Sequence, residues 1–196
     1  SSLINRGFNE VKGTVIFNCI EKIPESIPVR KNDRITILSV GRFVGQKDYY
    51  TAFQVIKILL KRCPDFNYTI VGQGELENEL RVFIREAELY HNVKFIINPS
   101  DVDIYYRTSD IFLSTSLFEG LSNSIMEAMS FGLPVVATDV GDNNYLVKEG
   151  ETGFLTKVKD AETIASKLEL LINDPEHRNT MGEKGRQHII ENFSIK

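Results

Sequence analysis

The sequence predicts a doubly wound α/β domain with a parallel sheet, and three observations point to it. Apolar runs rich in Val, Ile and Phe lack polar alternation, which is typical of strands buried on both faces. Runs with the apolar period of an amphipathic helix alternate with these strands along the chain. Polar and charged residues follow the strands, and a ligand is expected at the carboxyl ends of a parallel sheet of this kind.

Length and composition are those of an ordinary globular domain. The chain has 196 residues, of which 42% are hydrophobic and 26% are charged, and its formal net charge is -4. This acidic balance, without a basic stripe, argues against a nucleic-acid partner. The two cysteines and three histidines have no metal-ligand spacing, so no metal site is expected. No run approaches the roughly 20 apolar residues that span a bilayer.

The elements are expected in a regular order after a preparatory segment. Residues 1–34 are interpreted as a linker-like segment with a short strand at 14–17. Strands are predicted at 35–40, 66–71, 93–97, 110–115, 134–138 and 152–155. Helices are predicted at 48–62, 76–89, 101–108, 122–131, 142–149, 160–173 and 175–193. This order predicts Rossmann-like topology over residues 35–174.

Residues 175–196 are predicted to form a C-terminal helix that follows the Rossmann-like domain. Asp174-Pro175 is a helix-start signature, because proline suits the first helical position. The candidate packing residues on this helix are Met181, Ile189, Ile190 and Phe193. The helix is expected either to pack on the domain or to reach toward a partner domain.

A basic loop follows the first strand. Gly41-Arg42 ends the strand, and Lys47 closes the loop. Arginine offers a forked pair of donors and lysine a mobile point charge, a combination that suits a pyrophosphate. The alternative is solvated surface charge before a helix.

Gly72-Gln73-Gly74 follows the second strand and is a weaker signal. Glu77 stands where a dinucleotide-binding fingerprint needs its third glycine, so that motif fails. A tight turn beneath a ligand and a plain strand-to-helix turn both remain open.

The segment 118–138 concentrates the strongest chemistry. Its two carboxylates are Glu119 and Glu127. Backbone N–H groups at a helix start suit a phosphate, and a carboxylate suits a pair of ribose hydroxyls. For Glu127 the alternative is a capping box with Ser124, and for Glu119 it is a loop carboxylate favoured by the helix dipole. The polar run between them is Gly120, Leu121, Ser122 and Asn123.

Taken in order, these blocks resemble the C-terminal half of glycosyltransferase family 4, retaining enzymes of GT-B fold. The resemblance covers roughly residues 15–193. The chain departs from the family pattern at Asp48 and Asn98, where the family often has Gly, and at Tyr145, where it has Glu. The matching blocks are 15–20, 40–47, 70–74, 119–129, 132–138 and 149–155.

The resemblance implies a role for each candidate residue. Arg42 and Lys47 would stabilise the leaving diphosphate of a UDP- or GDP-sugar. Glu127 would hold the ribose, and Glu119 would contact the donor sugar. The loop with Asn98 would receive the base. The other donor-binding positions implied are Gly41, Gly72, Gly120, Leu121, Ser122 and Asn123. No metal and no further cofactor are implied.

The resemblance also implies a wider setting. Such an enzyme transfers a hexosyl unit to a glycan or lipid-linked acceptor, in polysaccharide biosynthesis. The acceptor would bind an N-terminal domain that this chain lacks, so transfer by the chain alone is not expected. A cytoplasmic enzyme is implied, with peripheral association at the inner face of the membrane.

Two functions from other classes remain open. One is half of a GT-B-like sugar-nucleotide epimerase, which would use the same edge of the sheet. The other is a non-enzymatic, flavodoxin-like binding module. Arg42 stands where a receiver domain carries its acidic cluster, which disfavours a regulatory receiver.

Overall fold

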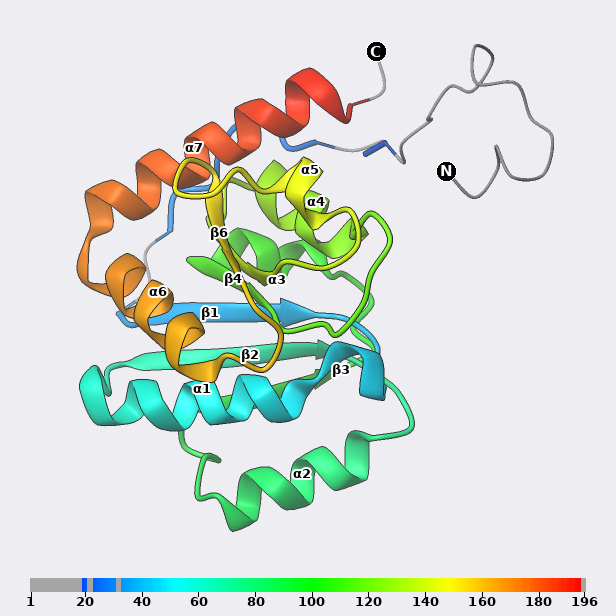
Figure 1. Ribbon diagram of the computed structural model, residues 1–196, viewed down its shortest axis with the longest axis vertical. Helices are drawn as coiled ribbons and strands as arrows, with labels where there is room; N and C mark the ends of the chain where they lie inside the picture. Colours follow the sequence, from blue (N-terminus) through cyan, green and yellow to red (C-terminus); the bar gives the residue numbers. More distant parts are fainter. Residues whose placement is uncertain (1–18, 21–22, 31–32, 195–196) are drawn as a thin grey trace, which may run out of the picture.

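The structure, a computed structural model, describes residues 19–20, 23–30 and 33–194. Within these residues, six parallel strands form a sheet in the order β3-β2-β1-β4-β5-β6 (Figure 1). The strands are β1 (Ile35–Val40), β2 (Phe66–Gly72), β3 (Val93–Ile97), β4 (Ile111–Ser114), β5 (Val135–Thr138) and β6 (Gly153–Thr156). The predicted doubly wound, Rossmann-like sheet is confirmed. The expected strand at 14–17 lies outside the described residues.

Helices cover both faces of the sheet (Figure 1). One hydrophobic cluster joins α1, α2 and α6 to one face, and a second joins α3, α4 and α7 to the other. Every residue of β4 and β5 is buried, as expected for strands between two helical layers. The helices are α1 (Tyr49–Arg62), α2 (Glu77–Glu86), α3 (Asp103–Thr108), α4 (Asn123–Ser130), α5 (Asn143–Leu146), α6 (Ala161–Asn173) and α7 (Pro175–Asn192), with a short 3-10 helix, η3 (Gly45–Lys47).

Aspartates start three of the helices. The Asp174 carboxylate accepts from the backbone N–H of His177 at 2.9 Å, and Pro175 takes the first position of α7. Asp160 caps α6 in the same way, and Asp48 caps α1. These caps satisfy N–H groups that have no partner inside the helix, so each start is set by local sequence.

The final helix packs on α4. Gly182 permits the close approach, because a Cβ there would lie 2.2 Å from the carbonyl oxygen of Gly132. The predicted packing residues Met181, Ile189 and Phe193 are buried. Ile190 is 40% exposed, so its predicted packing role is wrong. One residue turns a helix by about 100°, so Ile189 and Ile190 cannot both face the core.

Arg186 of α7 ties the segment before the sheet to the domain. It donates to the carbonyl oxygen of Ser130 at 2.7 Å and to that of Pro24 at 2.5 Å. Arg30 donates to the carbonyl oxygen of Phe131 at 2.7 Å. Residues 23–30, which belong to the predicted linker, are therefore held at the end of α4 and at α7.

Candidate functional site at the carboxyl edge of the sheet

The loops after β1 and β4 are joined at the carboxyl edge of the sheet. The N–H of Leu117 donates to the carbonyl oxygen of Gln46 at 2.8 Å. The Thr115 hydroxyl lies 3.0 Å from the carbonyl oxygens of both Lys47 and Asp48. Because these strands are neighbours, residues more than sixty positions apart meet in one site.

Lys47 and Glu119 form an ion pair across this junction. Their side chains are 18% and 9% exposed, so the pair is well shielded from solvent. The Ser116 hydroxyl donates to Oε1 of Glu119 at 2.7 Å, and the Gln46 amide nitrogen lies 3.5 Å from Oε2. Lys47 and Glu119 were expected to contact different parts of a ligand; in the structure they also contact each other.

Arg42 stands apart from this pair. It follows β1 at the same edge of the sheet and is exposed. Within the described residues, no ion pair or hydrogen bond is found for its side chain. The structure therefore places Arg42 near the predicted site without fixing its guanidinium.

The glycines after β1 and β2 are needed where these loops pack together. A Cβ at Gly72 would lie 1.9 Å from the carbonyl oxygen of Gly41, and one at Gly74 would lie 2.5 Å from that of Phe43. Phe43 is fully buried and stacks edge-on against Tyr49 with ring centroids 5.4 Å apart. Gly72 and Gly74 thus support the shape of the basic loop.

Helix α4 begins at Asn123, with Ser122 as its N-cap residue. Ser124 therefore lies inside the helix, so the Ser124–Glu127 capping box, one of the two alternatives for Glu127, is wrong. Ser122 is 3% exposed, and its hydroxyl lies 3.3 Å from that of Ser124 without capping the helix. The Glu127 carboxylate instead accepts a hydrogen bond from a partner on another helix.

That partner is Tyr106 of α3. Its hydroxyl donates to Oε2 of Glu127 at 2.7 Å. Burial raises the pKa of Glu127; the Tyr106 hydrogen bond opposes this, and the nearby charge of Asp103 adds to it. Burial also raises the pKa of Tyr106 well above its usual 10, so its hydroxyl stays protonated. Glu127 is consequently an acceptor held by a neutral donor.

Two departures from the family pattern share one backbone property. Asp48 has φ 44° and Asn98 has φ 41°, both in the left-handed region. Glycine adopts this region without strain, and aspartate and asparagine tolerate it better than other residues. The N–H of Asn98 also donates to the carbonyl oxygen of Gly72 at 3.4 Å. The loop after β3 can thus turn without glycine.

Sequence reasoning missed Gln46, Ser116, Tyr106 and Gly141. A Cβ at Gly141, where φ is 56°, would lie 2.0 Å from the carbonyl oxygen of Glu119. Gly141 therefore supports the Glu119 loop from the β5 side. The available signal for Gly141 was its place in the loop after β5, three residues beyond Thr138. Nothing in the local sequence pairs Tyr106 with Glu127.

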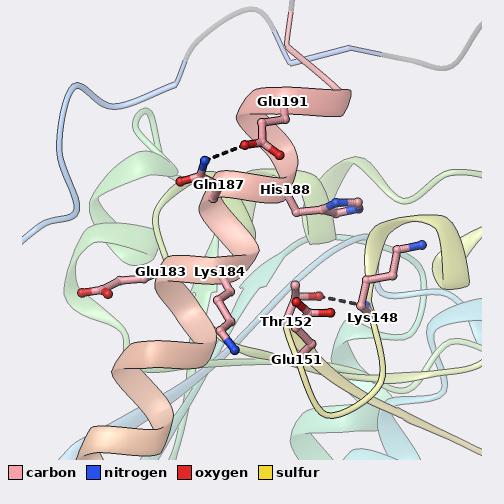
Figure 2. A pocket seen from close by; sticks show the side chains of 8 residues that line it. All are labelled: Lys148, Glu151, Thr152, Glu183, Lys184, Gln187, His188 and Glu191. Carbon is pink, nitrogen blue, oxygen red and sulfur yellow. Dashed lines mark hydrogen bonds between the residues drawn. The ribbon is translucent and has the colours of Figure 1, made fainter.

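A separate hollow lies between α7 and residues 148–152 (Figure 2). It has a volume of about 430 Å³ and contains none of the predicted site residues. Lysines and glutamates are mixed around it, so it does not present one sign of charge to a ligand. Its lining residues are Lys148, Glu151, Thr152, Glu183, Lys184, Gln187, His188 and Glu191.

Two features are absent from the described residues. They contain no group of three or more His, Cys, Asp or Glu side chains placed to hold a metal ion. None of their helices is both long enough and apolar enough to cross a membrane.

The parallel sheet, with charged loops joined at its carboxyl edge, defines a Rossmann-like domain with a candidate phosphate- and hydroxyl-binding site. A family model described as "Glycosyl transferases group 1" matches residues 21–188. The chain belongs to this family. The predicted resemblance is confirmed at this level.

Among similar proteins, an uncharacterized glycosyltransferase of Haemophilus influenzae is 38% identical, with 85% of this chain and 47% of the relative covered. The capsular polysaccharide biosynthesis glycosyltransferase CapM of Staphylococcus aureus is 32% identical, with 88% and 46% covered. The chain thus spans just under half the length of these curated relatives.

Two solved structures share the fold. TarM of Staphylococcus aureus, solved with fondaparinux, alpha-GlcNAc-glycerol and UDP, has a TM-score of 0.83 at 23% identity, with 98% of this chain and 39% of TarM covered. The C-terminal domain of the group 1 protein LpcC of Francisella tularensis has a TM-score of 0.75 at 24% identity. That match covers 85% of this chain and 89% of the LpcC chain.

Proposed function

We propose that this chain is the donor-binding, C-terminal domain of a retaining glycosyltransferase of family 4, which transfers a hexosyl unit from a UDP- or GDP-sugar. The observation that carries the proposal is the meeting of Lys47 and Glu119 at the carboxyl edge of the sheet. The match to an isolated C-terminal domain over 89% of its length supports the domain placement. The family membership favours this function over the epimerase and flavodoxin-like alternatives.

The geometry suggests how the donor is held. The diphosphate takes the Lys47 ammonium from Glu119, and Arg42 adds its exposed guanidinium. The backbone from Gly120 to Asn123 offers N–H groups at the start of α4. Glu119, released from Lys47, accepts hydroxyls of the donor sugar, while Glu127 accepts those of the ribose. The base lies at the loop with Asn98, beyond Gly41 and Gly72.

The proposed chemistry needs charge stabilisation at the leaving group. As the bond from the sugar to the diphosphate breaks, negative charge grows on the phosphate oxygens. In this proposal Lys47 and Arg42 stabilise that charge, and such stabilisation is strongest where water is excluded. The shielding of Lys47 by its neighbours suits this role.

The remaining parts of the proposal concern the whole enzyme. A glycan or lipid-linked acceptor would bind a second, N-terminal domain. The enzyme would act in polysaccharide biosynthesis, the process named for the relative CapM. The enzyme would work in the cytoplasm, with peripheral contact to the inner face of the membrane. The chain alone would then bind donor without transferring sugar, and robust transfer by the purified chain would contradict this.

Calorimetric titration with UDP, GDP and ADP tests donor binding and selects the base. Lys47→Met should weaken binding of the preferred diphosphate about tenfold, as expected for one charge-assisted contact. Lys57→Met is the matched control, because Lys57 is exposed on α1, away from the carboxyl edge. Equal affinities for the wild type and the Lys47 variant would remove this site assignment.

A further inference from the structure

Glu127 is held by a tyrosine whose own position is set by packing. Tyr106 is 1% exposed. Its ring stacks on Phe131 with centroids 5.5 Å apart and planes 14° apart, and lies near Phe112 with centroids 6.1 Å apart. The Tyr106 hydroxyl thus has a defined place, 2.7 Å from Oε2 of Glu127. A side chain packed this tightly can orient a more mobile one.

We infer that Tyr106 is a positioning residue that aims the Glu127 carboxylate at the ribose and thereby sets a preference for ribonucleotides over deoxyribonucleotides. This inference rests on the donor-binding function proposed above. Tyr106 belongs to α3 and is buried on the face of the sheet that carries α4, whereas the other residues of the proposed site lie in loops and on α4.

The hydrogen-bond capacity of Glu127 supports this role. An ionised carboxylate has about four acceptor positions on its two oxygens. Tyr106 occupies one position on Oε2, and no side chain or backbone group among the described residues bonds to Oε1. The free positions suffice for two neighbouring ribose hydroxyls. A deoxyribose offers one fewer donor, which leaves a half-buried acceptor unsatisfied and disfavours the wrong ligand.

Fixing one oxygen also reduces the cost of binding. A glutamate side chain loses rotamer freedom when a ligand orders it. Here Tyr106 has already ordered the end of the Glu127 side chain before the ligand arrives. The ribose contacts therefore form with a smaller loss of side-chain entropy. Without the hydroxyl, the carboxylate would retain its charge but lose its fixed direction.

The hydrogen bond from Tyr106 also affects the protonation of Glu127. Tyr106 lowers the pKa of Glu127 against the effect of burial, and Asp103, also on α3, raises it. From α7, Arg186 reaches α4 at the Ser130 carbonyl. A protonated Glu127 has fewer acceptor positions for ribose. Affinity for a ribonucleotide should therefore fall as pH drops through this pKa, and removing the Tyr106 hydroxyl should move that fall to higher pH.

Tyr106→Phe tests the inference because it keeps the stacked ring and removes only the hydroxyl. We expect wild-type chain to bind UDP about tenfold more tightly than 2′-deoxy-UDP, and the variant to lose most of this ratio. If the chain prefers guanine, GDP and 2′-deoxy-GDP replace this pair. Tyr105→Phe is the matched control: it removes a hydroxyl from the adjacent, half-buried residue of α3 and should leave the ratio unchanged.

Two further measurements separate positioning from a general structural effect. The UDP affinity, measured from pH 4.5 to 8, should lose strength at a higher pH in Tyr106→Phe than in wild type. Glu127→Gln should lower the ribose preference, and adding Tyr106→Phe to it should lower the preference no further. If Tyr106→Phe does not fold, Phe131→Leu replaces it, since this change loosens the stacked ring and keeps the hydroxyl.

Donor binding and the positioning role of Tyr106 can fail separately. If wild-type chain binds no nucleoside diphosphate, the proposed function fails and the inference fails with it. If the chain binds UDP, but Tyr106→Phe keeps both the ribose preference and the pH of half-maximal binding, Tyr106 has no positioning role. The same conclusion follows if Phe131→Leu, used in its place, keeps the ribose preference. Donor binding would then stand without it.

Discussion

Glu119 and Glu127 lie in one short segment, yet the fold gives them opposite surroundings. Glu119 lies in the loop after β4, where Lys47 from the loop after β1 forms an ion pair with it. Glu127 lies on a helix, where an uncharged tyrosine holds it. Burial raises the pKa of Glu127, and no cation in the described residues bonds to its carboxylate. The first carboxylate is paired with a charge that a phosphate can take over; the second is kept as an acceptor.

This difference suggests a division of labour in the proposed site. The Lys47–Glu119 pair must open for both groups to meet the donor, so this half of the site is rearranged by binding. The Tyr106–Glu127 pair can remain closed, because one carboxylate accepts several hydrogen bonds at once. Changes near Glu119 should therefore affect the diphosphate and sugar, and changes near Glu127 should affect the ribose.

The largest expected effect comes from Gly141→Ala, which disturbs the Glu119 loop alone. Its Cβ would meet the Glu119 carbonyl oxygen at 2.0 Å with φ at 56°, so overlap and backbone strain add. We expect the free energy of unfolding to fall by about 3 kcal/mol, measured by urea denaturation.

Gly150→Ala is the control for that substitution. Gly150 has φ 73°, but a Cβ there would have nothing within 4 Å, so only strain remains. A loss of about 1 kcal/mol is expected. Equal losses at both glycines would show that the contact with the Glu119 loop contributes nothing.

A moderate effect is expected on nucleotide affinity, with opposite signs at the two carboxylates. Glu119→Gln frees Lys47 from its ion pair, so UDP without a sugar should bind about threefold more tightly. Glu127→Gln removes charge from the ribose acceptor, so UDP should bind about tenfold more weakly. Calorimetry on both variants measures this, and a change of the same sign in both would contradict the division of labour.

The smallest expected effect is on stability and its pH dependence. Folding raises the pKa of Glu127, so the folded state binds a proton more tightly than the unfolded state does. Its contribution to stability is full below the unfolded-state pKa and is lost as pH rises through the folded-state pKa. Glu127→Gln should therefore raise the free energy of unfolding at pH 7.5, by less than about 1 kcal/mol, and this gain should vanish near pH 4.

Glu119→Gln provides the contrast in the same experiment. This substitution removes the Lys47 ion pair and should lower, not raise, the free energy of unfolding at pH 7.5. Urea denaturation at the two pH values compares both variants with wild type. A gain in stability for both would show that Lys47 does not stabilise the folded chain through Glu119.

The alternation of strands and helices, and the position of the loops after β1 and β4 at one edge of the sheet, were within reach of the sequence. Local signals carry this information: apolar runs mark the strands, and Asp174-Pro175 marks a helix start. Since parallel strands end at the same edge, Lys47 and Glu119 were expected near each other. Their direct ion pair was not, because its two ends lie 72 residues apart.

Two roles for Glu127 were left open by the sequence, and the tertiary structure excludes one of them, the capping box. The pattern Ser124–Glu127 satisfies a capping box locally, yet α4 starts at Asn123 and Tyr106 takes the carboxylate from 21 residues away. The left-handed backbone of Asp48 and Asn98 could not be predicted from the sequence either. Aspartate and asparagine tolerate that conformation but do not require it. Residue order alone determined the alternation of strands and helices, because hydrophobic periodicity is local. Which oxygen meets which donor was decided only when packing brought distant elements together.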